Sequence, residues 1–401
     1  MADNEAAPEL LERAPTQIFL GRVALQRDRL LAAGAAADRV ADEIPAFGHV
    51  TRAALKAALR ETDQALAELA ERIDRRGLTD TRLERFAMLR TATDRVVGEC
   101  FALAAGVLTR KAGLDGDACR EADEFIAELA SLINPSLARP TVPGEEEFLH
   151  RGVDVIRRRL PDNGVWDLAV MAHEFGHVLV AHHQRWDTTN DAKIDMQSMV
   201  EEGWAAYPRA PSEELFCDAF ATFVLGPAYA AALVLHRLDP AEQTAPASSG
   251  THPPDAARAV VVLEALGRLA VEETSETRVP LLHQYLTAAW ASLQAQSPAS
   301  LRLSDDDHLS LTMRTRRAHN DLARWLEPAQ FHWPSMTIQE VRKHLEGQQP
   351  TAGSAPRATI REVLNAAWLS RVEAWQTNCG LAEGLETRAR EAICRTAQRN
   401  E

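Results

Sequence analysis

A helical period in the hydrophobic residues places the strongest constraint on the fold of this chain. In the segment LKAALRETDQALAELAERI, leucines recur at spacings that put them on one face of a helix. That stripe consists of Leu55, Leu59, Leu66 and Leu69. The segment TDRVVGECFALAAGVLTRKAG has the same helical character, and no long alternating pattern typical of strands occurs. The sequence therefore predicts a mainly α fold with at most a small β element, for which GVDVIR at 152–157 is a candidate.

Breaks in the helical pattern indicate how the chain is divided. The break RGLTDTR offers Thr79 or Asp80 as the N-cap of the helix that follows. NPSLARPTVPGEEE is rich in proline, which favours a boundary between regions. We expect an N-terminal helical region over 1–134, a core that carries the chemistry over 135–275, and a C-terminal helical region over 276–401.

Composition excludes several classes of protein. The 401 residues are 46% hydrophobic, which is ample for a sizeable core, and the formal net charge is -14. We expect no nucleic-acid partner, since phosphate contact needs a basic face. The five cysteines form no CxxC pair, so neither a disulfide framework nor a cysteine-based zinc site is predicted. The acidic N-terminus resembles no secretory signal, and we expect a reducing, cytoplasmic location.

One apolar stretch bears on membrane association. FATFVLGPAYAAALVL, at 220–235, is shorter than the roughly 20 residues that span a bilayer. Gly226 and Pro227 interrupt it, and Asp218 lies just before it. We expect a pair of buried helices here and no membrane partner.

The chemistry concentrates in HEFGH, at 173–177, within a segment that is otherwise apolar. On a helix, His173 and His177 lie one turn apart, so both imidazoles can reach one metal ion. Glu174 lies beside them, where its carboxylate can hold and deprotonate a metal-bound water. The alternative is a pair of structural histidines, each hydrogen-bonded to backbone. The motif favours a Zn²⁺ site.

A catalytic zinc site needs a third protein ligand, and HEFGHVLVAHH offers one. His183 follows His177 at the metzincin spacing, but that turn needs a glycine where this chain has Val180. His182 and His183 instead fit a solvated helix end, where histidine also suits the negative pole of the helix dipole.

The segment SEELFCDAFA, at 212–221, offers a better third ligand. Glu214 and Asp218 lie one turn apart on an expected second helix, hence on one face. Glu214 can bind the metal, while Asp218 can accept a hydrogen bond from the outer nitrogen of a ligating histidine. The alternative is that the glutamates are ordinary acids of a first helical turn with Ser212 as cap. The rival ligands are Glu201, Glu202 and Glu213.

THPPDAAR, at 251–258, is a third element with two polar candidates. His252 can donate a hydrogen bond to an oxyanion or to substrate, and Arg258 can anchor a substrate carboxylate. Taken alone, His-Pro-Pro is also a signal for the start of a helix.

These three elements, in this order, resemble gluzincin-type zinc metallopeptidases. HExxH, then ExxxD, then THPxxxR is the pattern of HtpX and CAAX-prenyl-protease relatives. CDAFATFVLGP is also similar to the ImmA/IrrE proteases. The resemblance covers about 165–260 and implies a helical zincin-like core that hydrolyses peptide bonds, with Glu174 as general base and His252 as an oxyanion donor.

The expected substrate is a protein or a peptide, hydrolysed by a zinc-dependent metalloprotease. Two alternatives stay open. One is a helical binding or scaffold protein with a structural or inactive zinc site, in which His183 or Asp218 supplies a fourth ligand. The other is a regulatory protease that a protein partner activates through the helical flanks.

Overall fold

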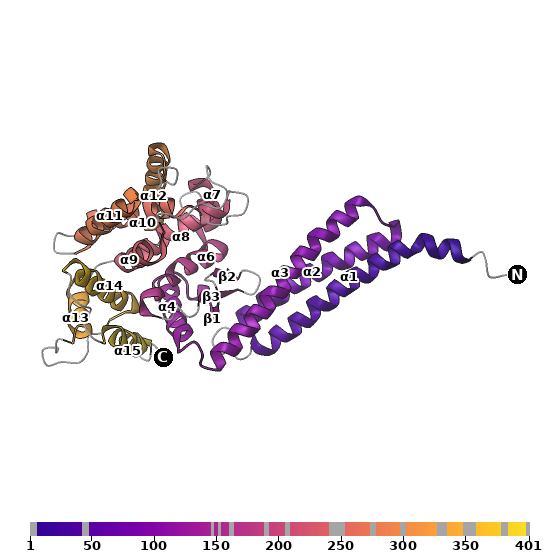
Figure 1. The fold of residues 1–401 in the computed structure, drawn as a ribbon, viewed down its shortest axis with the longest axis horizontal. Helices are drawn as coiled ribbons and strands as arrows, with labels where there is room; N and C mark the ends of the chain where they lie inside the picture. The colour runs from indigo at the N-terminus through magenta and orange to yellow at the C-terminus, as the bar shows by residue number, and fades with distance from the viewer. Residues whose placement is uncertain are drawn as a thin grey trace. The chain divides into compact units, whose positions relative to one another are not determined.

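The computed structural model describes most of the chain (Figure 1). The described residues are 6–41, 48–145, 148–150, 154–159, 164–187, 192–204, 209–239, 253–272, 278–296, 302–326, 335–347, 358–377 and 384–397. The chain forms two compact units. Unit 1 comprises Met1–Gly116 and Arg139–Leu160, and unit 2 comprises Asp117–Ala138 and Pro161–Glu401.

Unit 1 is built on three long helices that pack along one another (Figure 1). They are α1 (Ala6–Ala41), α2 (Gly48–Arg76) and α3 (Asp80–Lys111). Each helix buries one apolar stripe, as the leucine spacing predicts, and Leu55 and Leu66 are fully buried in two separate clusters. Thr79 is the N-cap of α3 and accepts a hydrogen bond from the backbone nitrogen of Arg82 at 3.4 Å.

A small sheet completes unit 1. Its strand order is β1 (Thr141–Gly144), β3 (Val155–Arg159) and β2 (Phe148–His150), with β1 parallel and β2 antiparallel to β3. The predicted β element at 152–157 thus overlaps β3. Strand β1 packs closely on α3, because a Cβ on Gly106 would lie 2.8 Å from the Cβ of Val142.

Unit 2 is a larger helical assembly (Figure 1). Its elements are α4 (Ala118–Ile133), η1 (Pro135–Leu137), α5 (Val165–Leu168), α6 (Met171–His182), β4 (Gln184–Asp187), β5 (Ala192–Asp195), α7 (Met196–Gly203), α8 (Arg209–Leu225), α9 (Pro227–Ala232), the π-helical turn η2 (Leu233–Arg237), α10 (Asp255–Glu272), α11 (Val279–Gln296), α12 (Asp305–Trp325), α13 (Ser335–Leu345), α14 (Ile360–Gln376) and α15 (Leu385–Ala397). Strands β4 and β5 pair as an antiparallel hairpin.

Helices α6 and α8 pack directly against each other in the core of unit 2. Every residue of α6 from Met171 to Val180 is buried. A Cβ on Gly176 would lie 3.1 Å from the side chain of Cys217 and 3.2 Å from its Cα. Glycine at this position therefore lets the two helix backbones approach closely, which brings the polar side chains of α6 and α8 within reach of each other.

The apolar stretch at 220–235 forms buried helices, as predicted. Helix α8 ends at Leu225, Gly226 takes a left-handed φ of 68°, and Pro227 begins α9. Among the described residues, every helix is too short or too polar to span a lipid bilayer. The mainly α fold with a small β element is confirmed.

The two units follow different boundaries from the three regions expected from sequence. Helix α4, expected in the N-terminal region, belongs to unit 2 because it packs on α6. Strand β1, within the proline-rich segment, and the strands β2 and β3 after it belong to unit 1, because β1 packs on α3. The chain passes from one unit to the other three times, after Gly116, Ala138 and Leu160. Contacts between residues distant in sequence decide these boundaries.

Candidate metal centre

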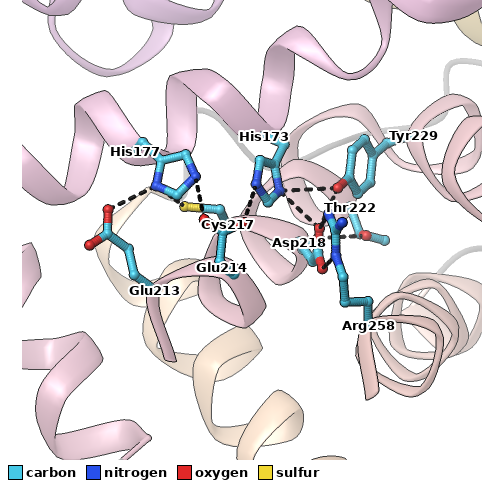
Figure 2. Close-up of polar contacts among 9 residues, drawn as sticks. All are labelled: His173, His177, Glu213, Glu214, Cys217, Asp218, Thr222, Tyr229 and Arg258. Atoms are coloured by element: carbon cyan, nitrogen blue, oxygen red, sulfur yellow. Dashed lines mark hydrogen bonds and ion pairs between the residues drawn. The ribbon is translucent and has the colours of Figure 1, made fainter. Parts of the chain in front are cut away.

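Two imidazoles on α6 face one carboxylate on α8 (Figure 2). Nε2 of His173 lies 3.1 Å from Oε2 of Glu214, and Nε2 of His177 lies 3.4 Å from Oε1. One ligand atom from each of the three residues lies within 4.8 Å of the others. The helical turn that separates the histidines puts both rings on the face of α6 that meets α8. This group can hold a metal ion.

The outer nitrogen of each imidazole has its own acidic partner. Nδ1 of His173 lies 2.8 Å from Oδ1 of Asp218, and Nδ1 of His177 lies 2.8 Å from Oε1 of Glu213. The thiol of Cys217 is also 3.5 Å from Nδ1 of His177. A carboxylate on Nδ1 favours a proton on that nitrogen, which leaves the Nε2 lone pair for a metal.

Asp218 is the centre of a buried polar network (Figure 2). Arg258 donates to both of its carboxylate oxygens at 2.8 Å, and the hydroxyl of Tyr229 donates to Oδ1 at 2.5 Å. Burial alone would raise the pKa of Asp218, but the charges and hydrogen bonds of Arg258 and His173 hold it well below its usual range. Asp218 is therefore an ionised acceptor.

Charge at the site also suits a cation. Among the described residues, the carboxylates of Glu174, Glu213, Glu214 and Asp218 converge there, together with the guanidinium of Arg258. Burial lowers the pKa of His173, but Asp218 and Glu214 outweigh it and raise that pKa to about 9. The pKa of His177 is likewise raised against the effect of burial, by Cys217, Glu213 and Glu214. The surroundings therefore favour positive charge, and a divalent cation on the two Nε2 atoms would supply it.

The carboxylate of Glu174 is a second indication that the site fits a bound ligand. Its side chain is buried, and its Oε2 atom has no hydrogen-bond partner among the residues that the structure describes. Burial raises the pKa of this carboxyl, and the neighbouring imidazoles of His177 and His173 oppose that rise. A buried carboxylate oxygen without a donor is costly unless a ligand or water satisfies it. The residues therefore fit a metal ion with bound water.

The other candidates for third ligand lie elsewhere. Glu201 and Glu202 are exposed on α7, and Glu213 contacts the outer nitrogen of His177. His182 is exposed at the end of α6, and His183 is the extended C-cap residue after it. Among the described residues, the group that can hold a metal contains none of these five.

Two predicted residues have a different outcome. His252 lies outside the described residues. Arg258 was expected to anchor a substrate carboxylate, but its guanidinium forms a fork on Asp218. The carboxylate that Arg258 binds is therefore the protein's own, because packing of α10 against α8 brings the two side chains together.

Sequence reasoning missed two residues that the fold brings to the site. The sequence indicates Glu213 only as a rival ligand, and no motif singles out Tyr229. The apolar run around Tyr229 held a signal, since a tyrosine hydroxyl in such a segment needs a buried partner. The sequence did not say which partner, because Tyr229 meets His173 and Asp218 only through tertiary packing.

Comparison with known proteins identifies no family. No protein-family model, no curated protein and no solved structure matches this chain. The case for a function therefore depends on the motifs and on the geometry of the site.

Proposed function

We propose that this protein is a zinc-dependent metallopeptidase that hydrolyses peptide bonds in a protein or peptide substrate. The observation that carries the proposal is the convergence of His173 Nε2 and His177 Nε2 on the Glu214 carboxylate, with Glu174 buried beside them. The resemblance to gluzincin-type peptidases supports the same reaction.

The donor set supports zinc as the metal. Two imidazoles and one carboxylate are the protein ligands of many catalytic zinc sites, which keep a further position for water or substrate. A structural site would need a fourth protein ligand. Asp218, one candidate for that ligand, already binds the outer nitrogen of His173 and the guanidinium of Arg258. Among the described residues the group has three members, which favours a catalytic site.

The chemistry follows from the roles that the side chains can take. Zinc, when bound, supplies a Lewis acid that lowers the pKa of water and polarises a carbonyl oxygen. The Glu174 carboxylate accepts the proton of the attacking water and returns it to the leaving amine. Its Oε2 atom, which accepts no hydrogen bond from the described part of the chain, can take that proton. Asp218 and Glu213 hold the two imidazoles by their outer nitrogens, so that neither ring turns away.

The variant Glu174→Gln tests this proposal. It keeps the shape of the side chain but removes the base, so we expect zinc content to stay unchanged and hydrolysis of an unfolded protein substrate to fall about 10²–10⁴-fold. Glu202→Gln, on the exposed face of α7, is the matched control and should retain full activity. Undiminished hydrolysis by Glu174→Gln would contradict the role of Glu174 as general base.

Zinc content separates the peptidase from the alternatives. We expect a single zinc ion per chain in the wild type and its loss in Glu214→Ala. Zinc bound by a protein that hydrolyses nothing, alone or with a partner, would instead favour a structural zinc site in a binding protein. Activity that requires a partner would identify a regulatory protease.

A further inference from the structure

We propose that Tyr229 and Arg258 are positioning residues that together hold the Asp218 carboxylate and thereby orient the His173 imidazole toward the metal. This inference deepens the proposed function and rests on it. Arg258 acts through Asp218, and Tyr229 acts through Asp218 and through its own contact with Nδ1 of His173.

The hydrogen bonds around Asp218 leave it only one way to bind His173. Oδ2 accepts from Nε of Arg258, and Oδ1 accepts from Nη2 of Arg258 and from the Tyr229 hydroxyl. A carboxylate that receives a guanidinium fork is ionised and can only accept. The hydrogen between Asp218 and His173 therefore belongs to Nδ1 of the imidazole, which directs the Nε2 lone pair toward Glu214.

Tyr229 also fixes the plane of the His173 ring. The two rings are nearly parallel, with an interplanar angle of 14° and centroids 6.4 Å apart, and the hydroxyl lies 3.2 Å from Nδ1 of His173. Because its single hydrogen goes to Asp218, the hydroxyl oxygen presents a lone pair to the imidazole N–H. The N–H of His173 is thus shared by two acceptors on one side of the ring.

Hydrogen bonds also hold the backbone just before Tyr229. The side chain of Asn365, on α14, donates to the carbonyl oxygen of Leu225 at 2.8 Å and accepts from the backbone nitrogen of Ala228 at 2.9 Å. These bonds clamp the turn between α8 and α9, whose left-handed residue is Gly226. The residues that orient the imidazole of His173 come from several helices. Asp218 lies on α8, Tyr229 on α9 and Arg258 on α10, while His173 itself lies on α6.

Tyr229→Phe and Arg258→Lys test the inference through metal binding. Tyr229→Phe removes one hydroxyl and keeps the ring, and Arg258→Lys keeps the charge but removes the fork. We expect each to weaken zinc affinity, measured against a competing chelator, by about 10–100-fold. We also expect the visible spectrum of the cobalt-substituted protein to change, because the ligand field follows the orientation of His173.

Matched variants control for general destabilisation. Tyr285→Phe, on α11, removes a hydroxyl outside the site. Arg237→Lys alters another arginine of unit 2, one that pairs with Asp167 at 2.9 Å. Both should bind zinc with wild-type affinity and give the wild-type cobalt spectrum. Should Arg258→Lys fail to fold, Tyr229→Phe decides the question alone.

The outcomes separate this inference from the proposed function. Wild-type zinc affinity and an unchanged cobalt spectrum in Tyr229→Phe would overturn the positioning role, even if the wild type is an active peptidase. Weakened zinc binding in a protein that hydrolyses no peptide would support positioning and contradict the proposed peptidase. A wild type that binds no zinc would overturn both.

Discussion

An exposed arginine–carboxylate pair in unit 1 and a buried one at the candidate metal site of unit 2 differ in almost every physical respect. On α2 of unit 1, Arg75 lies 2.5 Å from Glu71, and their side chains are 72% and 57% exposed. In unit 2, Arg258 lies 2.8 Å from Asp218, and the exposed fractions are 16% and 0%. Water screens the charges of the first pair. The charges of the second pair have lost their hydration on burial, and hydrogen bonds to protein groups must replace it.

The helices that carry these pairs explain the difference. Helix α2 is amphipathic, so its charged residues face solvent and its leucines form the core. Helix α8, which carries Asp218, is buried from Leu215 to Leu225, and Arg258 lies on α10, which packs on α8. The charge of Asp218 therefore lies in the core.

A buried ion pair contributes little net stability compared with packed apolar side chains. Unit 1 also contains a buried pair, Arg139 and Asp154 at 2.6 Å, so burial alone does not mark a functional site. The pair in unit 2 is distinguished by the contact of Asp218 with His173.

The largest expected effect comes from breaking the buried pair. Asp218→Asn keeps the shape but leaves the Arg258 guanidinium buried without its anion. We expect a loss of about 3–5 kcal/mol in the free energy of unfolding, measured by denaturant titration of the metal-free protein. A loss no greater than that of an exposed variant would show that solvent reaches the pair.

The next effect is stabilisation by zinc, which we expect to depend on the candidate site in unit 2. Zinc at about 100 times its dissociation constant should raise the free energy of unfolding of the wild type by about 2.7 kcal/mol, and a chelator should reverse the gain. His173→Gln should show no such gain, because a ligand is lost. Equal stabilisation of wild type and His173→Gln would mean that zinc binds elsewhere.

A glycine in each unit gives a steric comparison. Gly176→Ala places a methyl group 3.2 Å from the Cα of Cys217, so we expect a loss of about 1 kcal/mol from overpacking. Gly98→Ala, on α3, meets no atom within 4 Å and should gain about 0.5–1 kcal/mol from helix propensity. Thermal unfolding of both variants checks the opposite signs. A gain in both would show that α6 and α8 have room to separate.

The smallest effect is expected at the exposed pair. Glu71→Gln removes the charge partner of Arg75, and we expect a change within about 0.5 kcal/mol. High salt should leave even that difference undetectable, because exposed charges are screened. A loss as large as that of Asp218→Asn would contradict the comparison of the two pairs.

Much of this protein follows from local rules in its sequence. The spacing of Leu55 and Leu66 determined an amphipathic helix with a buried face. The break RGLTDTR predicted that the next helix begins at Thr79 or Asp80, and Thr79 is its N-cap. HEFGH determined that His173 and His177 share a face, because the period of a helix sets which side chains are neighbours. The Glu214 and Asp218 pair was predicted on the same ground.

Only the tertiary structure decided what those faces meet. Glu213 contacts His177, and Tyr229 and Arg258 contact Asp218. Each of these contacts joins two different helices, so the periodicity of a single helix cannot predict it. The sequence was consistent with Arg258 binding a substrate carboxylate. The packing of α10 on α8 instead places its guanidinium on Asp218. The physical reason is that helical periodicity orients side chains about one axis, whereas partners on other helices depend on how several axes pack together.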